Sequence, residues 1–194
     1  MIARLVGSEM CIRDSPSPRT AVARGCADAE AACLQGKATV LMSTSRGEIT
    51  IEVDGDAAPL TAGNFVDLVR RGTYDGTMFH RVVREPVPFV VQGGDPQSSD
   101  RSVPLSQLGT GSFVDPDNGV ARMIPLELSF QGEGAPRYSR VSSNPSELQD
   151  LVLTHERGAV AMARSQAPDS ASAQFYIALR TLPELDGRYA VFGR

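Results

Sequence analysis

Two polar side chains interrupt two short apolar runs, and their types and positions could support chemistry. Arg81 lies within residues 78–83, and Gln92 closes residues 89–92. Both runs are rich in β-branched and aromatic residues, which predicts two strands joined by a proline-containing bend and followed by a Gly-Gly turn. If these strands line a concave face, Arg81 and Gln92 become fixed polar groups in an apolar groove. That combination is typical of small-ligand and peptide sites.

Four motifs separated along the chain carry a family pattern. They are Phe79-His80-Arg81 with Phe89-Val90-Val91-Gln92-Gly93-Gly94-Asp95, then Gly-Ala-Val-Ala-Met-Ala (158–163), Ala-Gln-Phe-Tyr-Ile (173–177) and Leu-Asp-Gly-Arg-Tyr-Ala-Val-Phe-Gly (185–193). In this order they resemble the cyclophilin family of peptidyl-prolyl isomerases, and the similarity runs from about residue 38 to the last residue. A lone Gly-Gly-Asp would be uninformative, but four ordered motifs are specific.

The activity implied by this resemblance needs only polarisation of an amide. An X-Pro bond has a rotation barrier of about 20 kcal/mol because the amide is conjugated, and its uncatalysed interconversion takes tens of seconds or more. A guanidinium hydrogen-bonded to the prolyl nitrogen stabilises the pyramidal nitrogen of the twisted transition state. No nucleophile, metal or titrating base is required. We therefore expect no cofactor in this chain, whose only histidines are His80 and His155.

The resemblance also implies roles for individual positions. Arg81 is expected to be the catalytic arginine, and Gln92 the partner that holds Arg81 or the substrate carbonyl. The expected walls of the proline pocket are Phe89, Val90, Tyr176 and Leu185, with Tyr189 where other members have histidine; the expected peptide contacts are Ala163, Arg164 and Ser165, with Gln174 beside them. We expect His80, Met162, Phe175 and Phe192 to be packed core residues. Without the motifs, Arg81 would be interpreted as one half of a surface salt bridge.

Several departures from the family pattern affect the expected site. Phe89 follows Arg81 at a longer spacing than is usual, so the loop at residues 84–88 is enlarged at the rim of the pocket. Glu184 stands where many members have the tryptophan that contacts the drug cyclosporin, which predicts weak sensitivity to that drug. Arg164 replaces an asparagine whose backbone binds the peptide, which predicts a preference for acidic flanking residues.

The whole chain has the composition of one soluble globular domain. It has 194 residues, of which 41% are hydrophobic and 22% charged, and a net charge of -4. A chain of this length can bury a real core. Phosphate binding needs clustered Lys and Arg, so the net charge argues against a nucleic-acid surface. No apolar run approaches the roughly 20 residues of a membrane-spanning helix, and we expect a monomer.

Residues 1–37 show little periodicity and are expected to be disordered, a leader or an artefactual segment. Residues 5–15 resemble translated adaptor sequence, which would place the natural amino terminus elsewhere. Residues 19–37 fit either a remnant of a processed leader or a short Ala-rich helix around residues 27–34. For the three cysteines, Cys11, Cys26 and Cys33, we favour unpaired thiols, with a Cys26–Cys33 disulfide as the alternative in an oxidising compartment.

The regular elements follow in a mainly β pattern. Strands are predicted at 39–44, 48–54, 78–83, 89–92, 124–130, 158–164, 173–180 and 189–193, and a helix at 59–71 with Thr61 as a candidate N-cap. Residues 95–125 are expected to form a long polar loop, with a plain turn at 115–119 that does not complete a calcium loop. Residues 132–151 are expected to form a second polar loop, with a short helix capped by Ser146 or Asn144.

This pattern predicts a closed barrel or a sandwich, and the family resemblance implies a cyclophilin-like eight-stranded antiparallel barrel with capping helices in residues 38–194. Family members continue beyond the position of Arg194 with a helix and a last strand that completes the barrel. We therefore expect these two elements to be missing here and a sheet edge to be left unprotected.

The expected function is cis-trans isomerisation of X-Pro bonds in proline-containing polypeptides, which assists protein folding. The alternative is a catalytically weak proline-peptide-binding chaperone or assembly factor of the thylakoid lumen, and a third option is an inactive fragment. Residues 112–128 are similar to a subgroup of cyclophilins from cyanobacteria and from thylakoid lumens of plants and algae. This similarity favours a plastid or thylakoid-lumen location, with the cytoplasm as the alternative.

Overall fold

The computed structural model of the chain describes residues 2–6, 25–26 and 33–194. The strands are β1 (Ile2–Val6), β2 (Lys37–Thr44), β3 (Gly47–Asp54), β4 (Arg81–Val82), β5 (Val90–Gly93), β6 (Glu127–Leu128), β7 (Arg137–Tyr138), β8 (Val160–Met162), β9 (Phe175–Ala178) and β10 (Val191–Gly193). The helices are α1 (Pro59–Arg70) and α2 (Pro145–Gln149), with single 3-10 turns η1 (Pro96–Ser99), η2 (Leu105–Gln107) and η3 (Pro183–Leu185).

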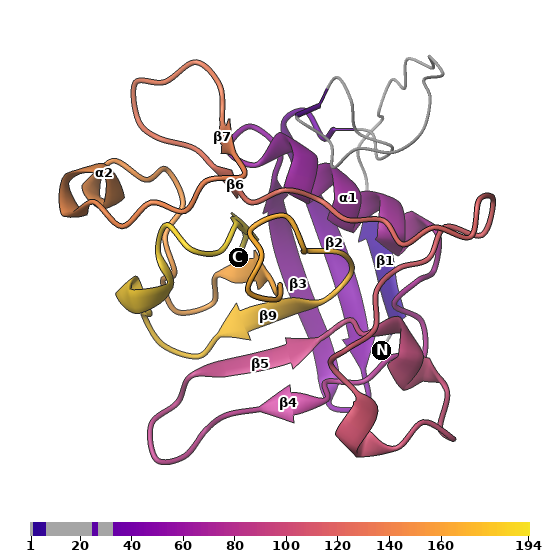
Figure 1. Ribbon diagram of the computed structural model, residues 1–194. Helices are drawn as coiled ribbons and strands as arrows, with labels where there is room; N and C mark the ends of the chain where they lie inside the picture. The colour runs from indigo at the N-terminus through magenta and orange to yellow at the C-terminus, as the bar shows by residue number, and fades with distance from the viewer. Residues whose placement is uncertain (1, 7–24, 27–32) are drawn as a thin grey trace.

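One antiparallel sheet dominates the fold, in the order β1-β2-β3-β10-β8-β9-β5-β4. It curls into a half-barrel, with α1 lying across β1, β2 and β3 (Figure 1). The predicted mainly β, antiparallel architecture is confirmed. In the described residues the two edges of the sheet, β1 and β4, do not pair with each other.

Alternating side chains explain the hairpin β2–β3 and the position of α1. Val40, Met42 and Ile51 are buried at 0%, 0% and 1% exposure, while residues between them in each strand face away. This period of two is what a sheet covered on one face requires. Pro59 starts α1, and the helix buries Phe65 and the residues around it in the same core.

The amino-terminal end of α1 is capped from a distant strand, so the predicted N-cap, Thr61, is wrong. The residue before the helix is Ala58, whose side chain cannot cap, and Thr61 already lies inside the first turn. The carboxylate of Glu127, in β6, accepts hydrogen bonds from the backbone N–H groups of Leu60 (3.1 Å) and Thr61 (2.7 Å). Tertiary structure therefore supplies the acceptor that the local sequence lacks.

The strands β8 and β9 have apolar residues on both faces. Met162 and Phe175 project into the main core, where Phe192 also lies, as predicted. Ala161 and Tyr176, one position along in each strand, belong to a second cluster on the opposite face. Because successive side chains of a strand alternate between faces, this sheet can support a core on one side and an apolar site on the other.

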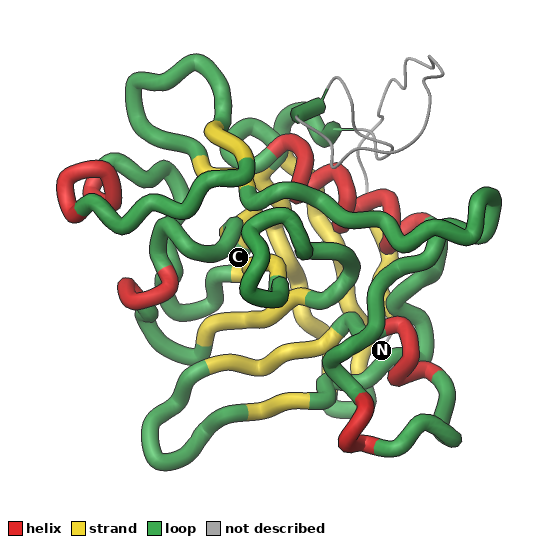
Figure 2. The backbone as a smooth tube through the Cα atoms, viewed as in Figure 1, coloured by secondary structure: helices red, strands yellow, loops and turns green. Residues whose placement is uncertain are grey.

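The segment between β5 and β8 is mostly loop, as predicted, but its regular elements differ from those expected (Figure 2). The strand expected at 124–130 is reduced to β6, which pairs with β7 in a stretch predicted to be loop. Helix α2 forms where a short helix was expected, and its N-cap is Asn144, whose side chain accepts from the N–H of Ser146 at 3.1 Å. Residues 115–119 close a turn through the N–H of Gly119 and the carbonyl of Asp115, 2.8 Å apart.

The amino-terminal segment differs from its expectation in two places. Residues 2–6 form β1, which pairs with β2 from Ile2↔Ser43 to Val6↔Thr39, because the open edge of β2 offers unpaired N–H and C=O groups. Cys26 and Cys33 form a disulfide with a Cα–Cα distance of 5.6 Å, so the favoured interpretation of both as free thiols is wrong. Cys11 and most of the helix considered at 27–34 lie outside the described residues.

Candidate functional site

One row of paired residues crosses four neighbouring strands and contains both predicted catalytic residues. Arg81 pairs with Gln92, Gln92 pairs with Tyr176, and Tyr176 pairs with Ala161. Side chains of directly paired residues project from the same face of a sheet. Arg81, Gln92 and Tyr176 therefore share one face, and two strand spacings of roughly 4.8 Å put the backbones of Arg81 and Tyr176 about 10 Å apart.

A chain of hydrogen bonds orients the guanidinium of Arg81. Its Nη1 donates to Oε1 of Gln92 at 3.3 Å, Nε2 of Gln92 donates to Oε1 of Gln174 at 3.1 Å, and Nε2 of Gln174 donates to the carbonyl of Gly111 at 2.8 Å. The carbonyl at the far end can only accept. It therefore determines the direction of both amides and turns the oxygen of Gln92 toward Arg81.

Arg81 lies at the surface and not at the depth that its apolar neighbours in the sequence indicated. It belongs to β4, an edge strand, and its side chain is exposed. In the described part of the chain its guanidinium has Gln92 as its hydrogen-bond partner and no carboxylate within ion-pair distance. The arrangement is therefore not the surface salt bridge that would have been the alternative, and the cation remains available to a ligand.

The apolar residues predicted to wall the pocket lie together on the face of the sheet that carries Arg81. Val90 and Tyr176 are buried in one cluster, at 2% and 5% exposure, and Phe89, Leu185 and Tyr189 pack against it while half buried. The predicted proline-containing bend closes β4 onto β5, because the N–H of Val83 donates to the carbonyl of Val90 and the N–H of Phe89 donates to the carbonyl of Val83, both at 2.9 Å. A cation thus lies at the margin of an aromatic and aliphatic surface.

A cavity of about 420 Å³ adjoins this surface on the side of Gln92. Its lining includes five of the predicted residues, Gln92, Ala163, Arg164, Ser165 and Gln174, together with the small residues of 109–112. The N–H of Ala163 already donates to the carbonyl of Gln174 (2.9 Å), and that of Ser165 to Oγ of Ser170 (3.0 Å). Of the three residues expected to offer backbone groups to a peptide, two therefore already use their N–H within the protein.

The side chain of Arg164 is held against its own loop, which the sequence did not predict. Its Nε donates to the carbonyl of Arg188 at 3.0 Å, and its Nη1 to the carbonyl of Ser165 at 2.9 Å. The guanidinium carbon also lies 4.8 Å from the ring centroid of Tyr189, in cation-π geometry. Many of its N–H donors are thus used within the protein. They are directed away from the acidic residues that the sequence predicted beside the proline of a preferred substrate.

His155 is a site residue that sequence reasoning missed. It is 1% exposed, its Nδ1 lies 2.7 Å from Oδ1 of Asp186, and its Nε2 lies 2.8 Å from the hydroxyl of Tyr176. Burial lowers the pKa of His155 below the usual 6.5, against the opposing effect of Asp186. The partners are 21 and 31 residues away in sequence, so no local pattern could have revealed the contact. Burial likewise lowers the pKa of half-buried His80.

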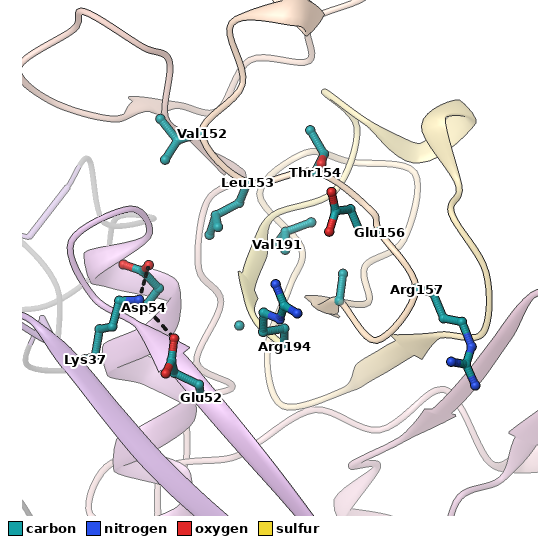
Figure 3. Close-up of a pocket in the computed structure, with 12 residues that line it drawn as sticks. Lys37, Glu52, Asp54, Val152, Leu153, Thr154, Glu156, Arg157, Val191 and Arg194 are labelled. Atoms are coloured by element: carbon teal, nitrogen blue, oxygen red, sulfur yellow. Dashed lines mark hydrogen bonds and ion pairs between the residues drawn. The ribbon is translucent and has the colours of Figure 1, made fainter.

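Figure 3 shows the residues that line a second cavity, of about 300 Å³. Three of its charged residues pair with one another, since Nζ of Lys37 lies 2.9 Å from a carboxylate oxygen of Glu52 and 3.8 Å from one of Asp54. None of the predicted site residues lines it. Within the described residues, no three acidic, His or Cys side chains are grouped for a metal ion, and no helix is long and apolar enough to cross a membrane.

Curated proteins similar to this chain are named as prolyl isomerases. A putative thylakoid lumen peptidyl-prolyl cis-trans isomerase of Synechocystis sp. is 40% identical over 170 residues, which cover 82% of this chain and 41% of that protein. A chloroplastic peptidyl-prolyl cis-trans isomerase of Arabidopsis thaliana is 38% identical over 153 residues, 74% of this chain and 32% of that protein. The chain thus spans less than half the length of these relatives.

Solved structures agree with the sequence comparison. A cyclophilin type peptidyl-prolyl cis-trans isomerase of Cryptosporidium parvum, crystallised in the presence of the dipeptide Ala-Pro, aligns with a TM-score of 0.54 and 25% identity, covering 80% of this chain and 77% of that one. Residues 39–194 match the family profile described as Cyclophilin type peptidyl-prolyl cis-trans isomerase/CLD. The chain therefore belongs to the cyclophilin-type peptidyl-prolyl cis-trans isomerase family.

Proposed function

We propose that this chain catalyses cis-trans isomerisation of X-Pro bonds in polypeptides. The observation that carries the proposal is the hydrogen-bond chain from Arg81 through Gln92 and Gln174 to the carbonyl of Gly111. It presents an oriented cation on the same face of the sheet as Tyr176 and the apolar cluster. A proline ring packed on that cluster would place its imide nitrogen near the guanidinium.

In the proposed mechanism the protein acts by stabilising a twisted amide. As the C–N bond rotates, conjugation is lost, and the prolyl nitrogen becomes pyramidal with a localised lone pair. An N–H of Arg81 donates to that lone pair, an interaction that the planar ground state does not offer. Binding energy expressed only in the transition state lowers the barrier. No covalent bond of the substrate is broken, and the residues named here need no proton transfer.

The peptide flanking the proline is expected to lie along the cavity beside Gln92. The backbone N–H groups of Ala163 and Ser165 have acceptors within the protein. We therefore assign the main donor for the peptide to the N–H of Arg164, and a second polar contact to the amide of Gln92. Because the cavity is lined by small residues such as Gly111 and Ser112, short polar side chains are expected to be accepted there.

The test is an NMR exchange or protease-coupled assay on a Suc-Ala-Xaa-Pro-Phe type peptide. A hydrogen bond to a charged group contributes about 1.5–3 kcal/mol, and each 1.4 kcal/mol is a factor of ten, so Arg81→Ala is expected to lower kcat/KM by about 10- to 100-fold. The control is Arg46→Ala, an exposed arginine in the β2–β3 turn, which is expected to retain activity. Full activity in Arg81→Ala would refute the proposal.

Peptide binding without turnover in the unmodified protein would favour the alternative, a proline-peptide-binding assembly factor. Binding is measured by titration with the same peptide, so one preparation distinguishes the two functions. Absence of both activity and binding, in a protein that unfolds cooperatively, would indicate an inactive domain. Size-exclusion chromatography with light scattering tests the expected monomer.

We further propose a plastid location, specifically the thylakoid lumen, with the cytoplasm as the alternative. The relatives named as thylakoid lumen and chloroplastic isomerases support it. The Cys26–Cys33 disulfide also supports it, because disulfides persist in oxidising compartments and are rare in reducing ones. Immunodetection in purified lumen, stroma and cytoplasmic fractions is the test, and recovery in the cytoplasm alone would contradict the proposal.

A further inference from the structure

We propose that His155 and Asp186 form a positioning pair that holds the hydroxyl of Tyr176 and thereby sets the affinity of the apolar site for proline peptides. The inference rests on the proposed function, because it concerns the surface on which the proline ring would pack. His155 is 1% exposed and cannot reach a peptide itself. Its effect must therefore pass through Tyr176, which belongs to the apolar cluster.

The hydrogen bonds determine which ring nitrogen of His155 carries the proton. Oδ1 of Asp186 receives both the backbone N–H of His155, at 2.8 Å, and its Nδ1, at 2.7 Å. A carboxylate only accepts, so Nδ1 must be the protonated nitrogen. In the neutral ring Nε2 is then an acceptor, and the hydroxyl of Tyr176 donates to it at 2.8 Å. The two ring nitrogens of His155 and the hydroxyl of Tyr176 therefore each have one partner and one direction.

Ring contacts extend this row to the surface of the site. Tyr176 lies parallel to His155, with 5.9 Å between ring centroids and 12° between planes, and meets Tyr189 edge-on at 5.8 Å and 84°. Tyr189 in turn lies under the guanidinium of Arg164, whose Nη2 donates to the carbonyl of Arg188 at 2.6 Å. Two of the aromatic rings of the expected pocket wall, Tyr176 and Tyr189, are therefore held in place by polar groups, His155 for the first and Arg164 for the second.

The loop after η3 is tied at two points to the segments on either side of β8. Asp186 binds His155 on one side, and the carbonyl of Arg188 binds Arg164 on the other, with Tyr189 immediately following. Loss of the His155 ring would weaken one of these ties, because the backbone N–H alone would still donate to Asp186, and it would free the hydroxyl of Tyr176. A pocket wall with more accessible rotamers binds its ligand more weakly, because ordering side chains on binding opposes association.

Protonation of His155 would change this arrangement. The charged groups around it are Asp186 and Glu184 on the loop and Glu156 and Arg157 on its own segment; β9 contributes Tyr176. On protonation Nε2 becomes a donor, so the hydroxyl hydrogen of Tyr176 loses its acceptor. The lowered pKa of His155 means that this happens in the folded protein only below the usual 6.5. Peptide affinity is therefore expected to fall in acid, below the pH at which a free histidine titrates.

The test compares His155→Gln, Tyr176→Phe and the double variant in the full chain, with KM and kcat measured on the tetrapeptide. Each single variant is expected to raise KM about three- to tenfold, in line with the loss of one buried hydrogen bond, and to change kcat less than about twofold. The KM of the double variant is expected to equal that of the single variant with the higher KM, because both changes remove the same contact. Far-UV circular dichroism verifies folding.

A pH series from 7.5 to 5 supplies the readout that a purely structural role would not change. The unmodified protein is expected to lose affinity in acid, and both single variants to lose this dependence. His80→Gln, which alters the other histidine, is expected to retain it. Additive KM effects, an unchanged KM in both single variants, or the same acid dependence in all proteins would overturn the inference.

Failure of the proposed function can be distinguished from failure of this inference. If the unmodified protein does not isomerise the peptide, the proposed function fails, and nitrogen-15 NMR of the histidine side chains still tests the pair. The expected spectrum shows His155 as the Nδ1–H tautomer, with a pKa that shifts in Tyr176→Phe. An Nε2–H tautomer, or a pKa unaffected by that substitution, would overturn the pairing whether or not the protein is an enzyme.

Discussion

Removing the carboxylate of Glu127 is expected to destabilise the whole domain, although this residue lies outside the proposed site. Glu127 is 2% exposed and accepts three hydrogen bonds, from the backbone N–H groups of Leu60 and Thr61 and from the hydroxyl of Tyr138 at 3.0 Å. The first two donors are among those that the start of an α-helix always leaves without an intrahelical partner. Because Ala58 cannot cap the helix, Glu127→Ala leaves them buried and unpaired.

The expected size follows from counting these donors. Loss of an N-cap costs about 1 kcal/mol, and a buried donor left without a partner costs about 1–3 kcal/mol. For Glu127→Ala we expect a loss of about 3–5 kcal/mol in the free energy of unfolding, a large part of the total of about 5–15 kcal/mol for a domain. Glu127→Gln keeps one acceptor oxygen but turns an NH₂ toward a donor, so we expect about 1–3 kcal/mol.

The ionisation of Glu127 makes the difference in stability between the unmodified protein and Glu127→Gln depend on pH. Burial raises its pKa above the usual 4.5, against the hydrogen bonds, which act in the opposite direction. The folded protein therefore takes up this proton at a higher pH than the unfolded chain does. The cost of burying the charge is fully present above the raised pKa and is relieved as the pH falls through it toward 4.5. The unmodified protein should gain stability relative to Glu127→Gln over that interval.

Urea unfolding followed by far-UV circular dichroism is the assay, since the chain has no tryptophan for fluorescence. The matched control is Glu48→Ala, an exposed glutamate on β3, which is expected to change stability by less than about 0.5 kcal/mol. A loss below about 1 kcal/mol in Glu127→Ala would refute the reasoning. It would mean that the donors of α1 find water or another acceptor, and that Glu127 is not the cap.

Two further predictions concern the proposed site. Gln174→Leu removes the link between Gln92 and the carbonyl of Gly111. Because Gln92 can then turn its amide, we expect kcat to fall about three- to tenfold with the protein still folded. An unchanged kcat would show that this chain of hydrogen bonds does not orient Arg81. Cyclosporin is expected to inhibit weakly because Glu184 is exposed and its carboxylate accepts from Arg180 at 2.6 Å. Glu184→Trp should tighten inhibition about tenfold or more through apolar contact, and tight inhibition of the unmodified protein would contradict this.

Patterns of short range were enough to predict most of the regular elements. The alternation through residues 39–54 predicted the β2–β3 hairpin, and Pro59 with the apolar stripe around Phe65 predicted α1, because one buried face imposes a period of two on a strand and of 3.6 on a helix. These features depend on neighbours in the chain. Strand ends were less accurate: residues 78–83 were predicted as a strand, but only Arg81–Val82 form β4.

The grouping of Arg81 with Gln92 was predictable for a similar reason. The two residues lie on strands joined by one short bend, so the register that pairs them is set locally. The position of Tyr176 and Gln174 beside them came from the family resemblance, because no local rule brings β9 next to β5. The exposure of Arg81 was missed, since a sequence does not reveal which strand will be an edge.

The sequence by itself determined most of the segments that become strands or helix, and the family pattern that their residues carry. Only the tertiary structure decided the partners of the buried polar groups: Glu127 at the start of α1, Asp186 on His155, and His155 on Tyr176. Such pairs join residues far apart in the chain, and a buried donor needs an acceptor wherever the fold happens to supply one. Periodicity reports the side of an element that is buried, but not which distant polar atom will meet it there.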